Sequence, residues 1–305
     1  MYVLFYNYWC RRHLSEDSEL VNSEAWHSIR TVDLHCLEKV DEALLRAILG
    51  SHSKCPIEML YLETGTMPLS FIVRSRRIMY LQTLLKRNNA ELTKQVLLAQ
   101  KRAPLKGDFV LLVQDDLNTL KIEENFSMIE NLSKQALKRI VKLKVRKAAF
   151  SYLLALKNQH SKVHHIAYKE LETQKYLKSI VFSNVEASLL FGLRTKTARQ
   201  FKANFPNLKM TCIHCPLKCW TANETPYIDS QEHILQCKKL CDFRVKEIAT
   251  QKVEYSNLFS DVKKQKEAVS LFKLLLDERE KLCPPGANLD PSTATDLCCS
   301  SNLVM

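Results

Sequence analysis

The stretch NLSKQALKRIVKLKVRKAAFSYLLALKNQH, residues Asn131–His160, shows the period of a helix more clearly than any other part of this chain. Its apolar residues recur at intervals of three and four, which places them along one side of a helix. The members of this predicted apolar stripe are Leu137, Val141, Val145, Ala148, Tyr152 and Leu156. The period therefore predicts one long amphipathic helix.

The same segment predicts a second, basic stripe. Its lysines and arginines recur every four residues and are widened by neighbouring cations; they are Lys134, Lys138, Lys142 and Arg146, with Arg139, Lys144 and Lys147 beside them. Like charges four residues apart repel by about a few tenths of a kcal/mol per pair, so the stripe opposes helix stability in isolation. A polyanion would relieve this repulsion. We therefore interpret the stripe as functional, with a solvated lysine-rich face as the alternative.

The positive charge of the chain is concentrated around this helix. The formal net charge is +12, and residues 131–210 contain 17 Lys and Arg against 3 acids, so the remainder of the chain carries −2. A local basic block is typical of a phosphate-binding surface. We expect RNA or single-stranded DNA as the partner, rather than a membrane or a small-molecule substrate. The predicted nucleic-acid-binding residues are Lys134, Lys138, Arg139, Lys142, Arg146, Lys147, Arg194, Lys196 and Arg199.

A cluster of cysteines and histidines follows the basic region. Five of the 11 cysteines fall within residues 212–241, and clustering beside histidine indicates a metal site rather than a disulfide framework. One close cysteine pair suits a turn, and a His/Cys pair four residues apart suits one face of a short helix, so together they can enclose a tetrahedral Zn²⁺. The predicted ligands of this structural Zn²⁺ are Cys215, Cys219, His233 and Cys237, with Cys212 and Cys241 as alternates. Reduced cysteines without a metal are the structural alternative.

Helical periods outside the central segment predict further helices. They are expected over residues 33–49, 69–87, 91–101, 108–120, 168–178, 184–204 and 258–282. Glycine is scarce, at 5 residues, which disfavours a sheet-rich fold with many tight turns. The segment after Cys283 is rich in Pro, Gly, Ser and Thr and is expected to be disordered. The predicted fold class is all-α and multi-helix, with a small zinc-knuckle module and a disordered C-terminal tail.

Catalysis is not expected from this sequence. It contains no GxxxxGK[ST], HExxH or GxSxG motif, and a Zn²⁺ with four protein ligands has no open position for water. The adjacent acids Asp115 and Asp116 lack the aromatic lead and the strand pattern of a polymerase palm, so we interpret them as a helix surface. Arg74, Arg76 and Arg77 are interpreted as solubilising their helix, with contact to a nucleic-acid backbone as the alternative.

The sequence also predicts a location for the protein. It offers no convincing secretory signal, and no run of apolar residues approaches the 18 or so that a membrane-spanning helix needs. Clustered cysteines with metal-ligand spacing favour a reducing compartment. We expect an intracellular protein, nuclear or cytoplasmic.

Eight segments, in this order, carry a resemblance to a known family. They are Leu44–Gly50 (LLRAILG), Pro56–Gly65 (PIEMLYLETG), Pro68–Leu81 (PLSFIVRSRRIMYL), Ala99–Asp108 (AQKRAPLKGD), Val145–Leu154 (VRKAAFSYLL), Lys175–Lys178 (KYLK), Leu193–Arg199 (LRTKTAR) and Asp229–Cys237 (DSQEHILQC). This arrangement resembles the region after the catalytic palm in polyproteins of non-long-terminal-repeat (LINE-type) retrotransposons. The resemblance covers roughly residues 25–282.

The resemblance implies the helical thumb and connector of an RNA-directed DNA polymerase, followed by a Cys/His knuckle that helps to grip template nucleic acid. It implies the zinc-ligand roles of Cys215, Cys219, His233 and Cys237. The fingers, the endonuclease and the palm with its aromatic-x-Asp-Asp motif are missing, as in a truncated copy. The implied function is a non-catalytic, nucleic-acid-binding remnant. A protein-interaction factor that uses the zinc module and the C-terminal amphipathic helix is one alternative, and a functionless product of a decayed element is another.

The expected organisation follows from these assignments. It comprises a divergent N-terminal segment (1–24), a thumb-like helical domain (25–130), a basic helical connector (131–210), the zinc knuckle (211–242), an amphipathic helix (243–282) and a disordered tail (283–305).

Overall fold

The structure is a computed structural model that describes residues 31–51, 53–163, 166–198, 259 and 261–282. These residues are mostly helical and include no strand, which confirms the all-α prediction for this part of the chain. The helices are α2 (Thr31–Leu49), α3 (Ile57–Thr64), α4 (Leu69–Leu85), α5 (Leu92–Arg102), α6 (Phe109–Thr119), α7 (Phe126–Asn131), α8 (Lys134–Asn158), α9 (Lys175–Lys178), α10 (Asn184–Arg194) and α13 (Val262–Leu282). The predicted zinc knuckle and tail lie outside the described residues.

The chain divides after Lys178 into two compact units, which are described separately. Within the described ranges, no helix combines the length and the apolar character needed to cross a membrane. In the first unit, α2, α4, α5, α6 and α8 begin and end within three residues of the helices that the sequence predicts.

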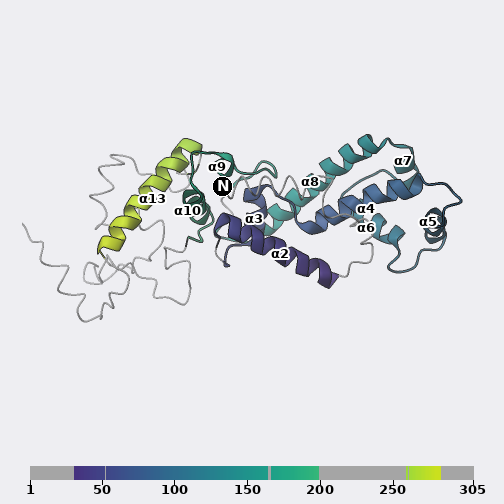
Figure 1. Ribbon diagram of the computed structural model, residues 1–305, viewed down its shortest axis with the longest axis horizontal. Coiled ribbons are helices and arrows are strands. Elements are labelled where there is room, and N and C mark those ends of the chain that lie inside the picture. The colour runs from purple at the N-terminus through teal and green to yellow at the C-terminus, as the bar shows by residue number, and fades with distance from the viewer. Residues whose placement is uncertain (1–30, 52, 164–165, 199–258, 260, 283–305) are drawn as a thin grey trace, which may run out of the picture. The chain divides into compact units, whose positions relative to one another are not determined.

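The first unit contains a buried helix, α3, that the sequence did not predict. Seven of its eight residues are buried, and it contacts both α2 and α8 (Figure 1). A helix that is buried on all sides has no polar face, so it shows no amphipathic period. Its start follows Pro56, and its end is set by Gly65, which adopts a left-handed φ of 70° and donates its N–H to the carbonyl of Tyr61. A short buried helix therefore stands in a segment for which the sequence predicted no helix.

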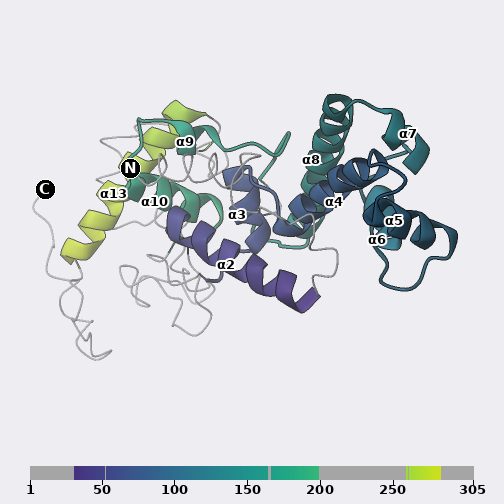
Figure 2. The same ribbon diagram turned by 45° about the vertical axis from the view of Figure 1, so that its right-hand side comes forward.

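Helix α8 packs against α4 and α3, and both views of the ribbon place α4 beside it (Figures 1 and 2). Gln82 of α4 donates to the carbonyls of Ile129 and Leu132, both at 3.0 Å, which fixes the entry to α8. Ser133 then caps α8 by accepting the N–H of Ala136. Helices α5, α6 and α7 also pack against α4.

The buried row of α8 differs from the predicted apolar stripe after its third member. The buried residues are Leu137, Val141, Val145, Ala149, Leu153 and Lys157. A step of four residues turns about 40° beyond a full turn, so this row winds around α8 and can face two partners in succession. Tyr152, predicted to be buried, is 50% exposed and its ring contacts that of Phe71.

A helix was predicted over residues 168–178, and this prediction was wrong for all but its last turn, α9. Residues 166–174, here called the strap, instead cross the C-terminal end of α3. The Tyr168 hydroxyl donates to the Glu63 carboxylate, and the Thr173 hydroxyl donates to the Thr64 carbonyl at 2.7 Å. Backbone and side-chain bonds to α3 therefore replace the bonds that a helix would have made within the strap.

In the second unit, α10 begins with a capping box, in which Ser183 and Glu186 each accept from the other's backbone N–H. The prediction of a helix over residues 184–204 was too long at its C-terminal end. After Arg194 the chain reverses through Lys196, which has a φ of 54°, and the N–H of Thr197 donates to the carbonyl of Gly192 at 2.8 Å. A residue with a left-handed φ cannot continue an α-helix, so α10 stops there.

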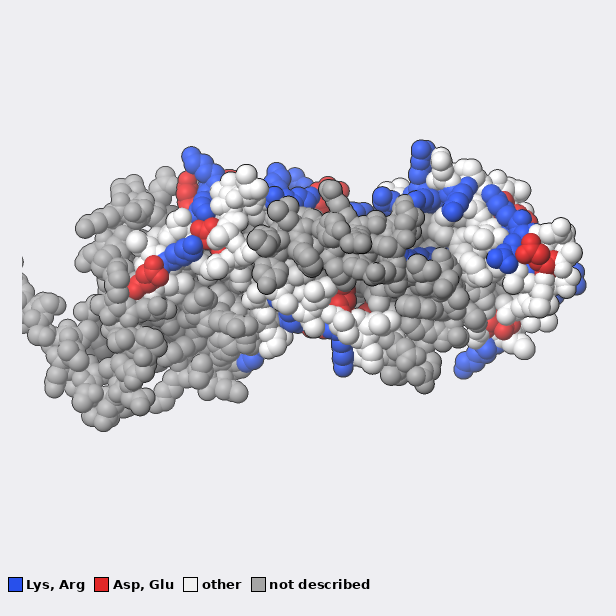
Figure 3. Space-filling view, in the orientation of Figure 1, with Lys and Arg blue, Asp and Glu red and all other residues white. Residues whose placement is uncertain are grey.

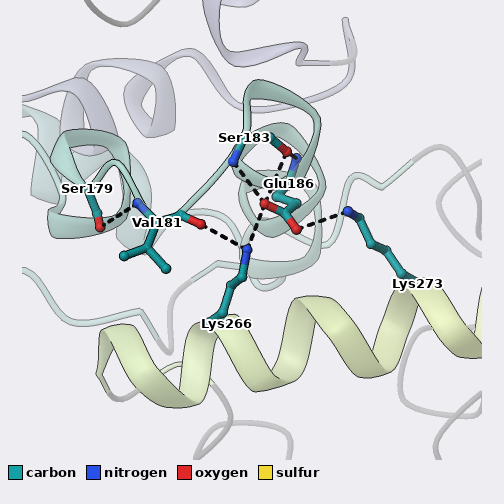
Figure 4. Close-up of polar contacts among 6 residues, drawn as sticks. All are labelled: Ser179, Val181, Ser183, Glu186, Lys266 and Lys273. Atoms are coloured by element: carbon teal, nitrogen blue, oxygen red, sulfur yellow. Dashed lines mark hydrogen bonds and ion pairs between the residues drawn. The ribbon is translucent and has the colours of Figure 1, made fainter.

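Glu186 also links α10 to α13 (Figure 4). Its carboxylate accepts from Lys266 at 2.9 Å and from Lys273 at 3.0 Å, and the Lys266 ammonium also donates to the Val181 carbonyl. The hydrogen bond from Lys266, followed by that from the Ser183 N–H, lowers the pKa of Glu186 to about 2. A lowered pKa in the folded protein means that the ionised carboxylate stabilises the folded state.

We expect Glu186→Gln to loosen the packing of α13 on α10 by about 1–2 kcal/mol at pH 7. This is less than the full pKa difference would give, because Lys266 and Lys273 are 35% and 41% exposed and water screens them. The stabilisation is present above the ordinary pKa of about 4.5 and is lost as the pH falls through about 2. Hydrogen exchange of peptides from α10 and α13 measures it. Glu267→Gln, at an exposed position of α13, is the control, and equal exchange in both variants would contradict the expectation.

Candidate nucleic-acid interface

Helix α8 carries eight lysines and arginines and no acidic residue. In Figure 3, Lys and Arg side chains gather at the upper right, where Figure 1 places the first half of this helix. Fourteen residues of the helix, from Lys134 to Lys147, hold seven of the eight cations. With a rise of 1.5 Å per residue, the basic segment is about 20 Å long.

Five of these cations are exposed and form what we call the basic face; they are Lys134, Lys138, Arg139, Lys142 and Lys147. They occupy two adjacent rows, each with a four-residue repeat, on the side of α8 away from its buried row. Among the described residues, none makes a hydrogen bond or an ion pair with the side chain of Lys134, Arg139, Lys142 or Lys147. In the described part of the chain no carboxylate neutralises these four side chains, which leaves them able to bind an external anion.

Two other cations of the predicted stripe donate hydrogen bonds to backbone carbonyls and so stabilise the fold. The Lys144 ammonium donates to the carbonyl of Lys121 at 2.8 Å. The guanidinium of Arg146 donates to the carbonyl of Leu171 in the strap. Backbone carbonyls at the ends of helices and in loops need donors, and cationic side chains supply strong ones. The sequence could not separate these residues from the basic face, because Arg146 continues the four-residue repeat of Lys142, and Lys144 lies between the two.

Two buried lysines also donate hydrogen bonds to backbone carbonyls. Lys157, at the end of the buried row, is 3% exposed and donates to the carbonyl of Ile166 at 2.6 Å. Its burial lowers the pKa of its ammonium below the ordinary value. Lys94 of α5 is 4% exposed and donates to the carbonyl of Leu85 in the last turn of α4. We call Lys94 and Lys157 the buried capping lysines.

The three predicted phosphate contacts beyond α8 fall in different situations. Arg194 is 8% exposed at the end of α10, so its side chain does not contribute to a surface. Lys196 is half-buried in the turn that follows. Arg199 lies outside the described residues. All three belong to the second unit, so they cannot be assigned to the basic face.

The predicted zinc ligands cannot be compared with the structure in the same way. Cys215, Cys219, His233 and Cys237 lie outside the described residues, as do Cys212 and Cys241. Among the residues that the structure does describe, no group of three or more His, Cys, Asp or Glu side chains could hold a metal ion. The structural Zn²⁺ therefore stays a prediction from the sequence.

The acid pair of α6 meets the arginines of α4. Asp116 is fully buried, and its carboxylate accepts from Arg77 Nε and Nη2, both at 2.7 Å, and from Arg74 Nη1 at 2.8 Å. Asp115 is 69% exposed, and its carboxylate accepts from Arg74 Nη1 at 3.0 Å. Burial raises the pKa of Asp116, while the hydrogen bonds from Arg77 and the charges of both arginines act in the opposite direction.

The interpretation of the acid pair as a helix surface was therefore right for Asp115 and wrong for Asp116. Both oxygens of Asp116 are occupied by arginines, which joins α4 to α6. The interpretation of Arg74 and Arg77 as solubilising residues was also wrong, since both are partners of this carboxylate. Sequence spacing could not reveal a pair whose members lie about 40 positions apart.

One residue of the basic face was overlooked at the sequence level. Leu143 lies between Arg139 and Lys147 in the same row and is 69% exposed. An apolar residue in an amphipathic helix is ordinarily assigned to the core, but its four-residue offset from Arg139 and Lys147 already placed it among the cations.

Comparison of the chain with protein-family models, with curated proteins and with solved structures finds no match.

Proposed function

We propose that the chain binds nucleic acid through the basic face of α8 and does so without catalysing a reaction. The observation that carries this proposal is a helix with eight cations and no acid, five of whose cations are exposed. Phosphates are the anions that such a linear array suits, because a polynucleotide presents one negative charge per nucleotide along its length. The resemblance to the region after the palm of LINE-type retrotransposon polyproteins supports an origin in such a protein.

The alternative of a protein-interaction factor receives less support. It would use the apolar side of the C-terminal amphipathic helix, now α13, to dock on a partner. Val269, Phe272 and Leu275 on that side are buried, and α13 packs on α10. A face that is already covered offers little to a partner protein.

The proposal is tested by the affinity of the purified chain for a labelled single strand, measured by fluorescence anisotropy over a salt series. If all five cations of the basic face contact phosphates, the logarithm of the association constant should fall with the logarithm of the salt concentration with a slope of roughly −3 to −4. We expect Lys138→Glu combined with Lys142→Glu to weaken binding by roughly tenfold or more at low salt. The slope should become shallower by about 1.5, because two contacts are lost.

The matched control is Arg102→Glu combined with Lys106→Glu. It changes the net charge by the same amount at exposed positions in and just after α5, outside the basic face. An unchanged unfolding midpoint shows that each variant is folded. Equal loss of affinity in the two double variants would show that net charge alone, and not the basic face, attracts the ligand.

A further inference from the structure

The cations of α8 lie on one flank of its exposed side only. One row contains Lys134, Lys138 and Lys142, and the neighbouring row contains Arg139 and Lys147. The opposite flank is the row of Ala136, Ile140, Lys144 and Ala148, all of which are half-buried. Its single cation, Lys144, is engaged by a backbone carbonyl. An anion with charges on both sides of the helix would therefore meet cations on one side alone.

This asymmetry distinguishes a duplex from a single strand. The major groove of B-DNA is about 12 Å wide and a helix with its side chains is about 10–12 Å across, so a helix in the groove lies between two phosphate rows. Such a helix benefits from cations on both flanks. The major groove of an RNA duplex is too narrow for side chains to read. A single strand needs only one line of cations, and α8 supplies one at intervals of about 6 Å.

Leu143 gives the second observation. It is 69% exposed at the middle of the basic face, with Arg139 and Lys147 one turn away on either side. An exposed leucine gains nothing from phosphates, and in a duplex the bases are stacked, so only their edges are open in the grooves. Unpaired bases have apolar faces that are available for contact, and proteins that bind single strands place apolar or aromatic side chains against them.

We infer that the ligand of the basic face is a single strand, and that Leu143 contacts an unpaired base while the flanking cations hold its phosphates. This inference rests on the proposed function. It adds the form of the nucleic acid and a residue that contacts its bases.

The test uses the full chain and three labelled probes of equal length: a 12-nucleotide single strand, its blunt duplex and an abasic strand. The intact strand is expected to bind more tightly than the duplex at the same salt concentration. Leu143→Ala should weaken binding of the intact strand roughly three- to tenfold, in line with the loss of an apolar contact. It should leave binding of the abasic strand unchanged. Leu105→Ala, at a loop leucine that is 71% exposed, is the control.

Each result decides one claim. Duplex binding as tight as strand binding would overturn the single-strand inference and leave the proposed function standing. Equal weakening of the intact and abasic strands by Leu143→Ala would overturn the base contact. Absence of binding to all three probes at low salt would overturn the proposed function itself.

Discussion

Replacing Asp116 with alanine is expected to lower the free energy of unfolding of the first unit by about 3 kcal/mol. The carboxylate is fully buried, and the variant would leave Arg77, which is only 12% exposed, with an unpaired charge. Removing one partner of a buried ion pair typically costs about 3–5 kcal/mol, because the remaining charge has lost both its partner and its water. Arg74 reduces the penalty, since it is 27% exposed and keeps Asp115. Urea denaturation followed by circular dichroism measures the change.

Asp115→Ala provides the matched control. The two acids are neighbours on α6 and share Arg74, but Asp115 is 69% exposed, so its removal should cost less than about 0.5 kcal/mol. A second variant, Asp116→Ala with Arg77→Leu, removes the stranded charge and should recover much of the loss. If both single variants unfold at the same urea concentration as the unaltered chain, the buried pair makes no net contribution to stability.

Replacing Gly65 with alanine is expected to detach the strap from α3. The φ of this residue is +70°, and an added Cβ would lie 2.2 Å from the backbone nitrogen of Thr173 and 2.4 Å from the carbonyl carbon of Glu172. Backbone atoms at such distances must move, which breaks the bonds from Tyr168 and Thr173 to α3. With about 1 kcal/mol for each bond and about 1 kcal/mol for the left-handed φ, we expect a total of about 3 kcal/mol.

Hydrogen exchange locates this effect. Amides of residues 166–178 should lose protection in Gly65→Ala, while those of α4 and α8 keep theirs. Gly107→Ala is the control, because Gly107 has a φ of +94° but no atom lies within 4 Å of an added Cβ. It should cost only about 1 kcal/mol, from the backbone alone. Unaltered protection of the strap in Gly65→Ala would show that this close approach does not hold it.

Local patterns predicted the elements whose stability is local. The period of α8, the helix of α4 and the end of α2 at Gly50 could be found because each depends on residues within a few turns. Helix α3 could not, because the partners of its buried acids lie far along the chain. Glu58 contacts His160 Nε2 at 3.0 Å, and Glu63 accepts from Tyr168, 105 positions away. From the sequence alone, a glutamate is assigned to the surface, because its burial depends on partners that the local sequence does not show.

In the candidate site, too, local patterns could be predicted from the sequence and contacts between distant residues could not. The sequence identified the five cations of the basic face, but it grouped them with Arg146, which holds the strap, and with Arg194, which is buried. A four-residue repeat specifies which side chains share a row. It does not specify where a winding row passes from solvent to the interior, since that depends on the crossing of α8 with α4 and α3.

The buried capping lysines, Lys94 and Lys157, divide the lysines of this chain into two chemical classes. At 4% and 3% exposure, their amines are closed to an acetyltransferase or an acylating reagent as long as the chain is folded. The lysines of the basic face are open to both. Because acetylation removes the charge of a lysine, it would remove four of the five charges of the basic face and spare the buried amines that donate to backbone carbonyls. Acetylation would therefore switch off the proposed nucleic-acid binding without disturbing the buried hydrogen bonds of the fold.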